Sequence, residues 1–143
     1  MSDFGSFTSP KNKCLATTIL DMKIIEVDEK VTRDEQLQQD VGTVTQIVTY
    51  TVNPEDTDQF LRTWAYVAEI AKKSTPGVIS AQLYRGIAGS NVFTSNLVFE
   101  STEAIRQLYK NPDFPAKLSE FPPRTVAAPH LFRKVAVPGI CVD

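Results

Sequence analysis

The first strong pattern in the chain is an alternation of large apolar side chains with threonines over residues 44–52. Alternating β-branched and polar residues are typical of a strand with one buried face. The same period recurs further along, where Phe93, Leu97 and Phe99 fall on one side of a segment. The sequence therefore predicts four strands, at residues 44–52, 78–85, 91–100 and 130–137.

Apolar residues spaced three or four positions apart follow the first and third of these strands. Phe60, Trp64 and Val67 share one face of a helix for which Asn53 is the predicted N-cap and Pro54 the first residue. A second helix has Ser101 or Thr102 as its cap, and a third, shorter helix has the spacing of Phe114, Leu118 and Phe121. We expect helices at residues 54–73, 101–110 and 114–121.

The order strand-helix-strand occurs twice in succession, which predicts an α+β domain of the ferredoxin-like βαββαβ type. Helices that follow strands in this rhythm cover one face of an antiparallel sheet. We expect this domain to span residues 41–138, with an N-terminal extension over residues 1–40 that is partly flexible and a short tail over residues 139–143.

Two parts of the extension have their own patterns. Residues 15–27 are rich in apolar side chains and predict an extra strand or an extended segment lying on the domain. Residues 28–40 predict a linker or a short surface helix, and the charged run from Glu26 to Asp40 is expected to face solvent.

The predicted sheet has more apolar residues than one face can hold. Ile47, Ile79, Leu83, Val92 and Val98 cannot all face the helices, because a strand alternates its faces. A large bare apolar face is unfavourable on a monomer, and a second copy of the same face can cover it. We therefore expect a homodimer.

Composition narrows the classes of partner. The formal net charge is -2, with acids and bases interspersed, which argues against nucleic acid and against an anionic membrane surface. No apolar run approaches the roughly 20 residues that a membrane span needs, and the first residues lack a secretory pattern. We expect a cytoplasmic protein in which Cys14 and Cys141 are reduced thiols, with a bridge between them as the alternative if the two ends of the chain meet.

The ligand inventory predicts a protein without a metal, flavin or haem cofactor. His130 is the only histidine, there is no Cys-x-x-Cys motif, and no glycine-rich G-x-G-x-x-G loop is present.

Several short motifs in order resemble the antibiotic biosynthesis monooxygenase family over residues 41–137. They are NPE at 53–55, FLRTW at 60–64, PGVIS at 76–80, LYR at 83–85, FESTEA at 99–104 and NPDF at 111–114. The resemblance implies a dimeric α+β barrel with a pocket between sheet and helices in each subunit. The best-known members oxidise electron-rich aromatic polyketides of secondary metabolism, such as anthrones, to quinones with oxygen and without metal or flavin.

The resemblance also implies which aromatic residues bind the substrate. Trp64 matches a helix position at which a tryptophan walls the pocket in the quinone-forming members. Those members have an asparagine one turn earlier, where this chain has Phe60, which we also expect to contact the substrate. Phe114, Leu118 and Phe121 are expected to close the pocket. Each of these residues has an alternative role as ordinary core.

The candidate polar groups come from the predicted strands. His130 is a candidate general base, because its ordinary pKa lies near neutrality. Tyr84 and Arg85 are candidates for binding a carbonyl or an enolate, and Asn96 and Gln82 for orienting the substrate. A strand-end histidine, a sheet-edge tyrosine, an interface arginine and hydrogen-bonded amides are the structural alternatives.

Three functions follow from these features. The first is a cofactor-independent monooxygenase acting on a hydrophobic aromatic or polyketide-like molecule. The second is a non-oxidative cyclase or isomerase with the same pocket, and the third is a dimer that binds a small ligand without turnover. Haem degradation is disfavoured, because the predicted helix at 101–110 has no histidine to bind iron.

Overall fold

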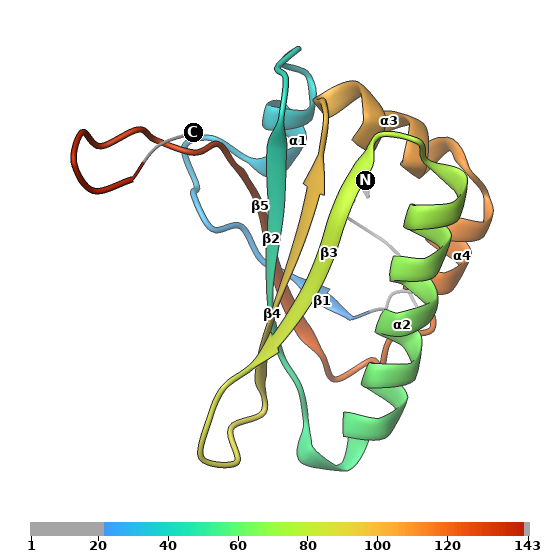
Figure 1. Ribbon diagram of the computed structural model, residues 1–143. Helices are drawn as coiled ribbons and strands as arrows, with labels where there is room; N and C mark the ends of the chain where they lie inside the picture. The colour runs from blue at the N-terminus through green and yellow to red at the C-terminus, as the bar shows by residue number, and fades with distance from the viewer. Residues whose placement is uncertain (1–21, 142–143) are drawn as a thin grey trace.

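A five-stranded sheet has its longer helices on one face in the computed structural model, which describes residues 22–141 (Figure 1). The elements are β1 (Lys23–Ile24), α1 (Arg33–Leu37), β2 (Val44–Thr51), the 3-10 turn η2 (Pro54–Asp56), α2 (Thr57–Ser74), β3 (Val78–Arg85), β4 (Val92–Phe99), α3 (Thr102–Lys110), α4 (Asp113–Leu118) and β5 (Val126–Phe132). The strand order is β1-β5-β2-β4-β3. The strands β5, β2, β4 and β3 pair antiparallel with their neighbours in the sheet, which confirms the ferredoxin-like fold. At the edge, β1 pairs parallel to β5.

The predicted helix starts are present. The Asn53 side chain accepts a hydrogen bond from the backbone N–H of Glu55 at 3.1 Å, at the start of the 3-10 turn that leads into α2. Ser101 caps α3 by accepting from the backbone N–H of Ala104, also at 3.1 Å. These bonds satisfy N–H groups that have no partner inside the helix.

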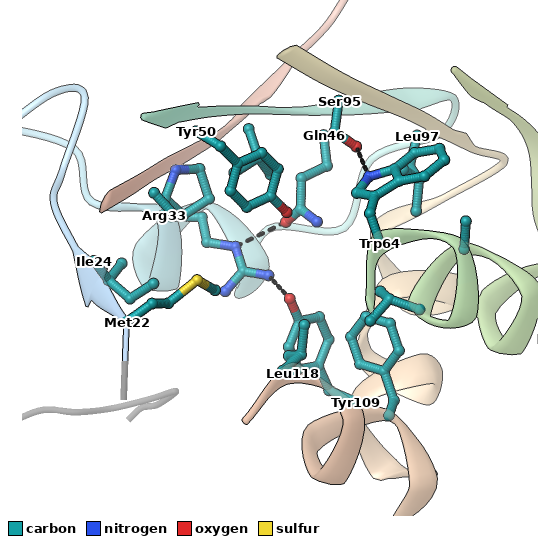
Figure 2. Close-up of a pocket in the computed structure, with 16 residues that line it drawn as sticks. Met22, Ile24, Arg33, Gln46, Tyr50, Trp64, Ser95, Leu97, Tyr109 and Leu118 are labelled. Atoms are coloured by element: carbon teal, nitrogen blue, oxygen red, sulfur yellow. Dashed lines mark hydrogen bonds between the residues drawn. The ribbon is translucent and has the colours of Figure 1, made fainter. Parts of the chain in front are cut away.

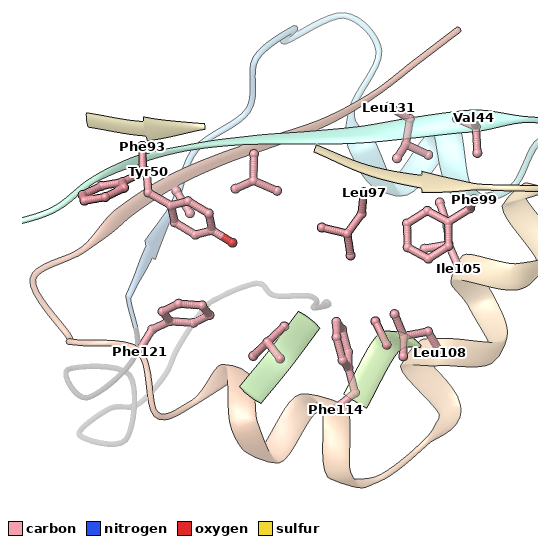
Figure 3. Packing of buried hydrophobic residues seen from close by; sticks show 14 of the residues in the cluster. Val44, Tyr50, Phe93, Leu97, Phe99, Ile105, Leu108, Phe114, Phe121 and Leu131 are labelled. Atoms are coloured by element: carbon pink, nitrogen blue, oxygen red, sulfur yellow. The ribbon is translucent and has the colours of Figure 1, made fainter. Parts of the chain in front are cut away.

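The core lies between the sheet and helices α2, α3 and α4 (Figure 3). An aromatic cluster fills the end of it near α2, where the Phe60 ring lies 4.9 Å from that of Tyr50 and 4.8 Å from that of Phe93. Phe121 stacks on Tyr50 with 5.5 Å between ring centroids. This packing holds α2 against β2 and β4 and so fixes the position of Trp64, one turn further along the helix.

The last strand begins and ends earlier than predicted, at Val126–Phe132 instead of residues 130–137. Pro129 lies inside it, opposite Val48 of β2. The carbonyls of Thr125 and Ala127 accept from β1, so odd-numbered residues of β5 direct their backbone toward β1. The missing N–H of Pro129 therefore costs no bond to β2, and a proline is tolerated here.

The extension packs on the domain more closely than the sequence predicts. β1 confirms an extra strand within the described part of residues 15–27. The expectation that the charged run faces solvent is wrong at Arg33, which is 4% exposed. The side-chain amide of Gln36 donates to the carbonyl of Leu131 and accepts from its N–H, both at 2.9 Å. Gln36 thus takes the place of a strand partner at the β5 edge, beyond the point where Pro129 ends pairing with β1.

The outer face of the sheet, opposite the helices, is partly apolar. Ile47, Val92 and Val98 alternate with buried neighbours and lie on this face. Leu83 faces the other way, because it pairs with Ser95 and packs against the core after a β-bulge that follows Val78. Ile79 is 58% exposed.

Two further observations concern the described residues only. Between residues 22 and 141, no helix has the length and apolar character needed to cross a membrane. The predicted flexible tail and Cys14 fall outside the described residues, and Cys141 is exposed at their end.

Candidate functional site

A narrow pocket lies between the sheet and the helices, and residues from both sides line it (Figure 2). Its lining is formed by Met22, Ile24, Arg33, Gln46, Val48, Tyr50, Trp64, Val67, Ala68, Ser95, Leu97, Tyr109, Phe114, Leu118, Ala127 and Pro129. The cavity itself is small, about 50 Å³. A mostly apolar wall with a few convergent polar groups is the usual character of a small-molecule site. A three-ring ligand requires some of these side chains to move.

Trp64 forms one wall and is held there by a hydrogen bond. Its indole Nε1–H donates to Ser95 Oγ of β4 at 3.0 Å (Figure 2). Trp64 is partly buried, unlike the fully buried Phe60 of the same helix. The bond fixes the plane of the ring, so a flat surface is presented to the pocket before any ligand arrives.

The apolar residues predicted to bind the substrate divide between the pocket lining and the rest of the core. Trp64, Phe114 and Leu118 line the pocket. Phe60 and Phe121 are not part of the lining; both are almost fully buried, and their rings pack on each other at 5.5 Å. Their placement in the substrate site is therefore corrected to a place in the core.

The structure brings none of the five predicted polar residues to the pocket lining. Ile47 of β2 lies on the outer face, and its cross-strand partners are His130 of β5 and Asn96 of β4. Both partners therefore lie on the outer face as well. Gln82 and Tyr84 of β3 pair with Asn96 and Thr94 of β4, which places them on the outer face too. Arg85 stacks on Phe93 at 5.1 Å and donates to the carbonyl of Ser90 at 2.8 Å, near the turn after β3.

The reason is one of register, since each strand sends alternate residues to opposite faces. In β5 the helix-facing positions are Ala127, Pro129 and Leu131, which leaves His130 on the other side. There its Nε2 lies 3.2 Å from the Gln36 side-chain nitrogen, and its ring packs edge-on against Phe132.

The polar groups that do line the pocket were not predicted. Arg33 Nε donates to Gln46 Oε1 at 2.9 Å, and one of its terminal nitrogens donates to the Tyr109 hydroxyl at 2.5 Å. The guanidinium also lies 4.8 Å from the centre of the Tyr109 ring. Gln46 had a usable signal, because it occupies a helix-facing position between Val44 and Val48. Arg33 had none, because it sits in a charged run.

Tyr50 brings a further hydroxyl toward the space between sheet and helices (Figure 3). Burial is the main cause that raises the pKa of the Tyr50 phenol; the nearby Tyr109 raises it further and Arg33 opposes the shift. Tyr50 therefore stays protonated well above neutral pH.

Replacing Tyr50 by phenylalanine should flatten the alkaline loss of stability. The unfolded phenol ionises near 10 and the folded one only at higher pH, so the unfolded state loses its proton first. The stabilisation is complete below pH 10 and is lost as the pH rises. By pH 11 the wild type should have lost about 1.4 kcal/mol more than the variant, measured by urea unfolding at a series of pH values. Parallel curves would show that Tyr50 ionises freely in the fold.

Metal binding finds little support in the described part of the chain. Within residues 22–141, no group of three or more His, Cys, Asp or Glu side chains is placed to hold an ion.

Comparison with known proteins adds family information. The model of the family described as antibiotic biosynthesis monooxygenase matches residues 43–116, just over half of the chain. SnoaB, a cofactor-independent oxygenase from Streptomyces nogalater, is 19% identical and superposes with a TM-score of 0.62 over 69% of this chain and 99% of its own. A proposed antibiotic biosynthesis monooxygenase from Bordetella bronchiseptica is 17% identical, with a TM-score of 0.55 over 67% of this chain and 100% of its own. No curated protein matches the chain significantly.

Proposed function

This chain belongs to the antibiotic biosynthesis monooxygenase family, and on that premise we propose that its pocket binds an electron-rich aromatic molecule and oxidises it with molecular oxygen. The substrate class is that of hydrophobic, polyketide-like compounds with an activated C–H group, such as anthrones. The reaction needs no cofactor, in keeping with what is said of the SnoaB structure.

The observation that carries this proposal is the preset aromatic wall. Trp64 is partly buried, lines the pocket and is fixed to Ser95 by its indole N–H. Leu97 and Phe114 add apolar wall, while Arg33 and Gln46 give polar contacts at one end. A flat aromatic ligand suits a pocket with an apolar wall and a polar end, because stacking on the indole stabilises the complex beyond the burial of apolar surface.

The chemistry balances with oxygen as the sole oxidant. Loss of a C–H proton to water leaves a substrate anion, which gives one electron to oxygen. The resulting radical and superoxide combine to form a C–O bond. The peroxide then takes up a proton, its O–O bond breaks, and loss of the second hydrogen from the same carbon releases water. The net change is a CH₂ group and O₂ converted to C=O and H₂O.

The same proposal includes a homodimer built on the outer sheet face. That face has an exposed apolar side chain at Val92, and the partly buried Ile47 and Val98 also lie on it. It also has two buried polar atoms, Asn96 Oδ1 and His130 Nδ1, that lack a hydrogen-bond partner among the described residues. A second copy would cover the apolar surface.

Light scattering after size exclusion at micromolar concentration should give twice the chain mass of 15.9 kDa. Ile47→Lys, in the middle of the outer face, should yield a monomer, because it places a charge in the interface. Tyr66→Lys, on the exposed side of α2, is the matched control and should stay dimeric. A wild-type monomer would contradict the proposal.

Oxygen uptake in the presence of an anthrone tests the function itself. We expect uptake and quinone formation above the spontaneous rate. Binding of the anthrone without uptake would favour a ligand-binding protein, and conversion without uptake would favour a cyclase or isomerase.

A further inference from the structure

We propose that the Tyr50 hydroxyl and the Gln46 side-chain amide donate hydrogen bonds to the carbonyl oxygen of a ketone ligand and stabilise the enolate that forms from it. This inference rests on the proposed function, because it concerns the same pocket, and it names the groups that recognise the substrate there. The pair selects ketones over hydrocarbons of the same shape.

The Tyr50 hydroxyl is the first donor. Tyr50 is 6% exposed, lines the pocket and brings its oxygen toward the space between sheet and helices (Figure 3). The ring is held in place, because Phe60 packs edge-on against it with 4.9 Å between centroids and Phe121 stacks on it at 5.5 Å. Within residues 22–141 the hydroxyl has no hydrogen-bond partner. A buried phenol usually has one, and here the open place for it is the pocket.

The Gln46 side-chain nitrogen is the second donor. Gln46 is likewise 6% exposed and lies four residues before Tyr50, on the same helix-facing side of β2. Arg33 Nε donates to Gln46 Oε1 at 2.9 Å. Since an arginine can only donate, this bond assigns the amide oxygen to Arg33 and turns the NH₂ group away from it. That nitrogen has no hydrogen-bond partner in the described part of the chain.

Both donors belong to one small space. Tyr50 and Gln46 line the same cavity of about 50 Å³, and Arg33, which bonds to Gln46, lies close enough to affect the pKa of the Tyr50 phenol. Burial raises that pKa, so the phenol keeps the proton that it donates. Apolar side chains, Trp64 among them, form most of the remaining lining. Such a site suits a flat apolar ligand with an oxygen that accepts hydrogen bonds.

The carbonyl oxygen is also where charge develops in the reaction. When the C–H group of an anthrone loses its proton to water, the electron pair of that bond moves into the ring system and places negative charge on the carbonyl oxygen. Two fixed donors bind this oxygen more strongly in the anion than in the ketone, which favours formation of the enolate. The enolate is the species that gives its electron to oxygen in the proposed function.

The binding test uses 9-fluorenone and fluorene, flat three-ring probes that differ in the carbonyl. Quenching of Trp64 fluorescence gives both affinities, and the infrared C=O stretch of isotope-labelled fluorenone reports hydrogen bonds to its oxygen. In the wild type this stretch should lie at lower wavenumber than in a hydrocarbon solvent. Tyr50→Phe and Gln46→Glu should each move it back and weaken fluorenone binding about fivefold or more, with less than about twofold change for fluorene.

The variants are chosen to leave the fold intact. Gln46→Glu keeps an oxygen for Arg33 and removes the donor, and Tyr50→Phe removes a hydroxyl that has no partner among the described residues. Tyr66→Phe removes the hydroxyl of an exposed tyrosine on α2 and is the matched control, which should change neither the stretch nor the affinities. Thermal unfolding of each variant shows whether it is folded.

Hydrogen exchange in heavy water tests the stabilisation of the enolate. In the absence of oxygen, the wild type should accelerate exchange of the methylene hydrogens of anthrone above the rate in buffer. Tyr50→Phe should slow this protein-dependent exchange at least about tenfold, because it removes one of the two donors to the developing anion. Tyr66→Phe should leave the rate unchanged.

The outcomes separate this inference from the proposed function, because none of these measurements uses oxygen. If fluorenone binds to the wild type with the stretch that it has in hydrocarbon, the paired donors are overturned and the aromatic pocket stands, whether or not the variants fold. A stretch that either folded variant leaves unchanged, equal weakening of both probes, or exchange no faster than in buffer would also overturn them. If neither probe binds to the wild type, the proposed function and this inference both fail.

Discussion

Trp64→Ala should weaken the binding of an anthraquinone-type ligand by at least about tenfold, which corresponds to about 1.4 kcal/mol. The indole is the largest flat surface in the pocket lining, and its bond to Ser95 holds it in place before binding. Since the side chain is only partly buried, its removal should cost less stability than the loss of a core aromatic, about 2 kcal/mol or less.

Two variants make this result specific. Tyr66→Ala removes an aromatic ring that is 54% exposed on the same helix and should leave ligand affinity unchanged. Trp64→Phe keeps a ring but removes the donor to Ser95, and should fall between wild type and Trp64→Ala. Severe destabilisation by Trp64→Ala with unchanged affinity in the folded fraction would make Trp64 a core residue and not a binding one.

Phe60→Ala should have the opposite profile, with a loss of about 3–5 kcal/mol in the free energy of unfolding. Phe60 has no exposed surface and contacts the rings of Tyr50, Phe93 and Phe121. The cavity left behind cannot close without moving β2 or α2, which is why the expected loss is large.

Urea unfolding of Phe60→Ala beside Leu61→Ala provides the measurement. Leu61 is the next residue of α2 and is 37% exposed, so its truncation should cost roughly 1 kcal/mol or less. Similar losses for the two variants would contradict the assignment of Phe60 to the core. Affinity of folded Phe60→Ala for the ligand should stay close to that of the wild type, because Phe60 does not line the pocket.

Local patterns in the sequence were sufficient for the fold, because each element has its own signal. The period-two alternation of β2 places Val44, Val48 and Tyr50 inside, as the structure confirms. The cap at Ser101 and the stripe containing Ile105 and Leu108 define α3 in the same way. These signals act over one or two turns of chain, so they need no knowledge of what packs against them.

The site was harder to predict, because it depends on register and on contacts between distant segments. Whether His130 faces the pocket is decided by a shift of one residue in β5, and the proline before it obscured where that strand begins. Arg33 and Tyr109 are 76 positions apart in sequence and meet only in the fold. A charged run with no apolar stripe gives no sign that one of its members is buried.

The assignment of Gln46 shows where more could have been predicted. A polar residue on the buried face of an otherwise apolar strand must find a hydrogen-bond partner. The same argument applies to Ser95, which lies between Phe93 and Leu97 on the inner face of β4 and accepts from Trp64. Such interruptions of a buried face point to the polar side of a pocket.

The most direct test of the central claim is the fate of heavy-isotope oxygen gas during conversion of an anthrone by the purified protein. We predict that one heavy atom enters the new carbonyl of the quinone and the other leaves as water, at a rate that Trp64→Ala reduces and Tyr66→Ala does not. A carbonyl oxygen derived from solvent water, excluding exchange of the finished quinone in a parallel incubation, or a rate equal to the spontaneous oxidation, would contradict oxidation by molecular oxygen in this pocket.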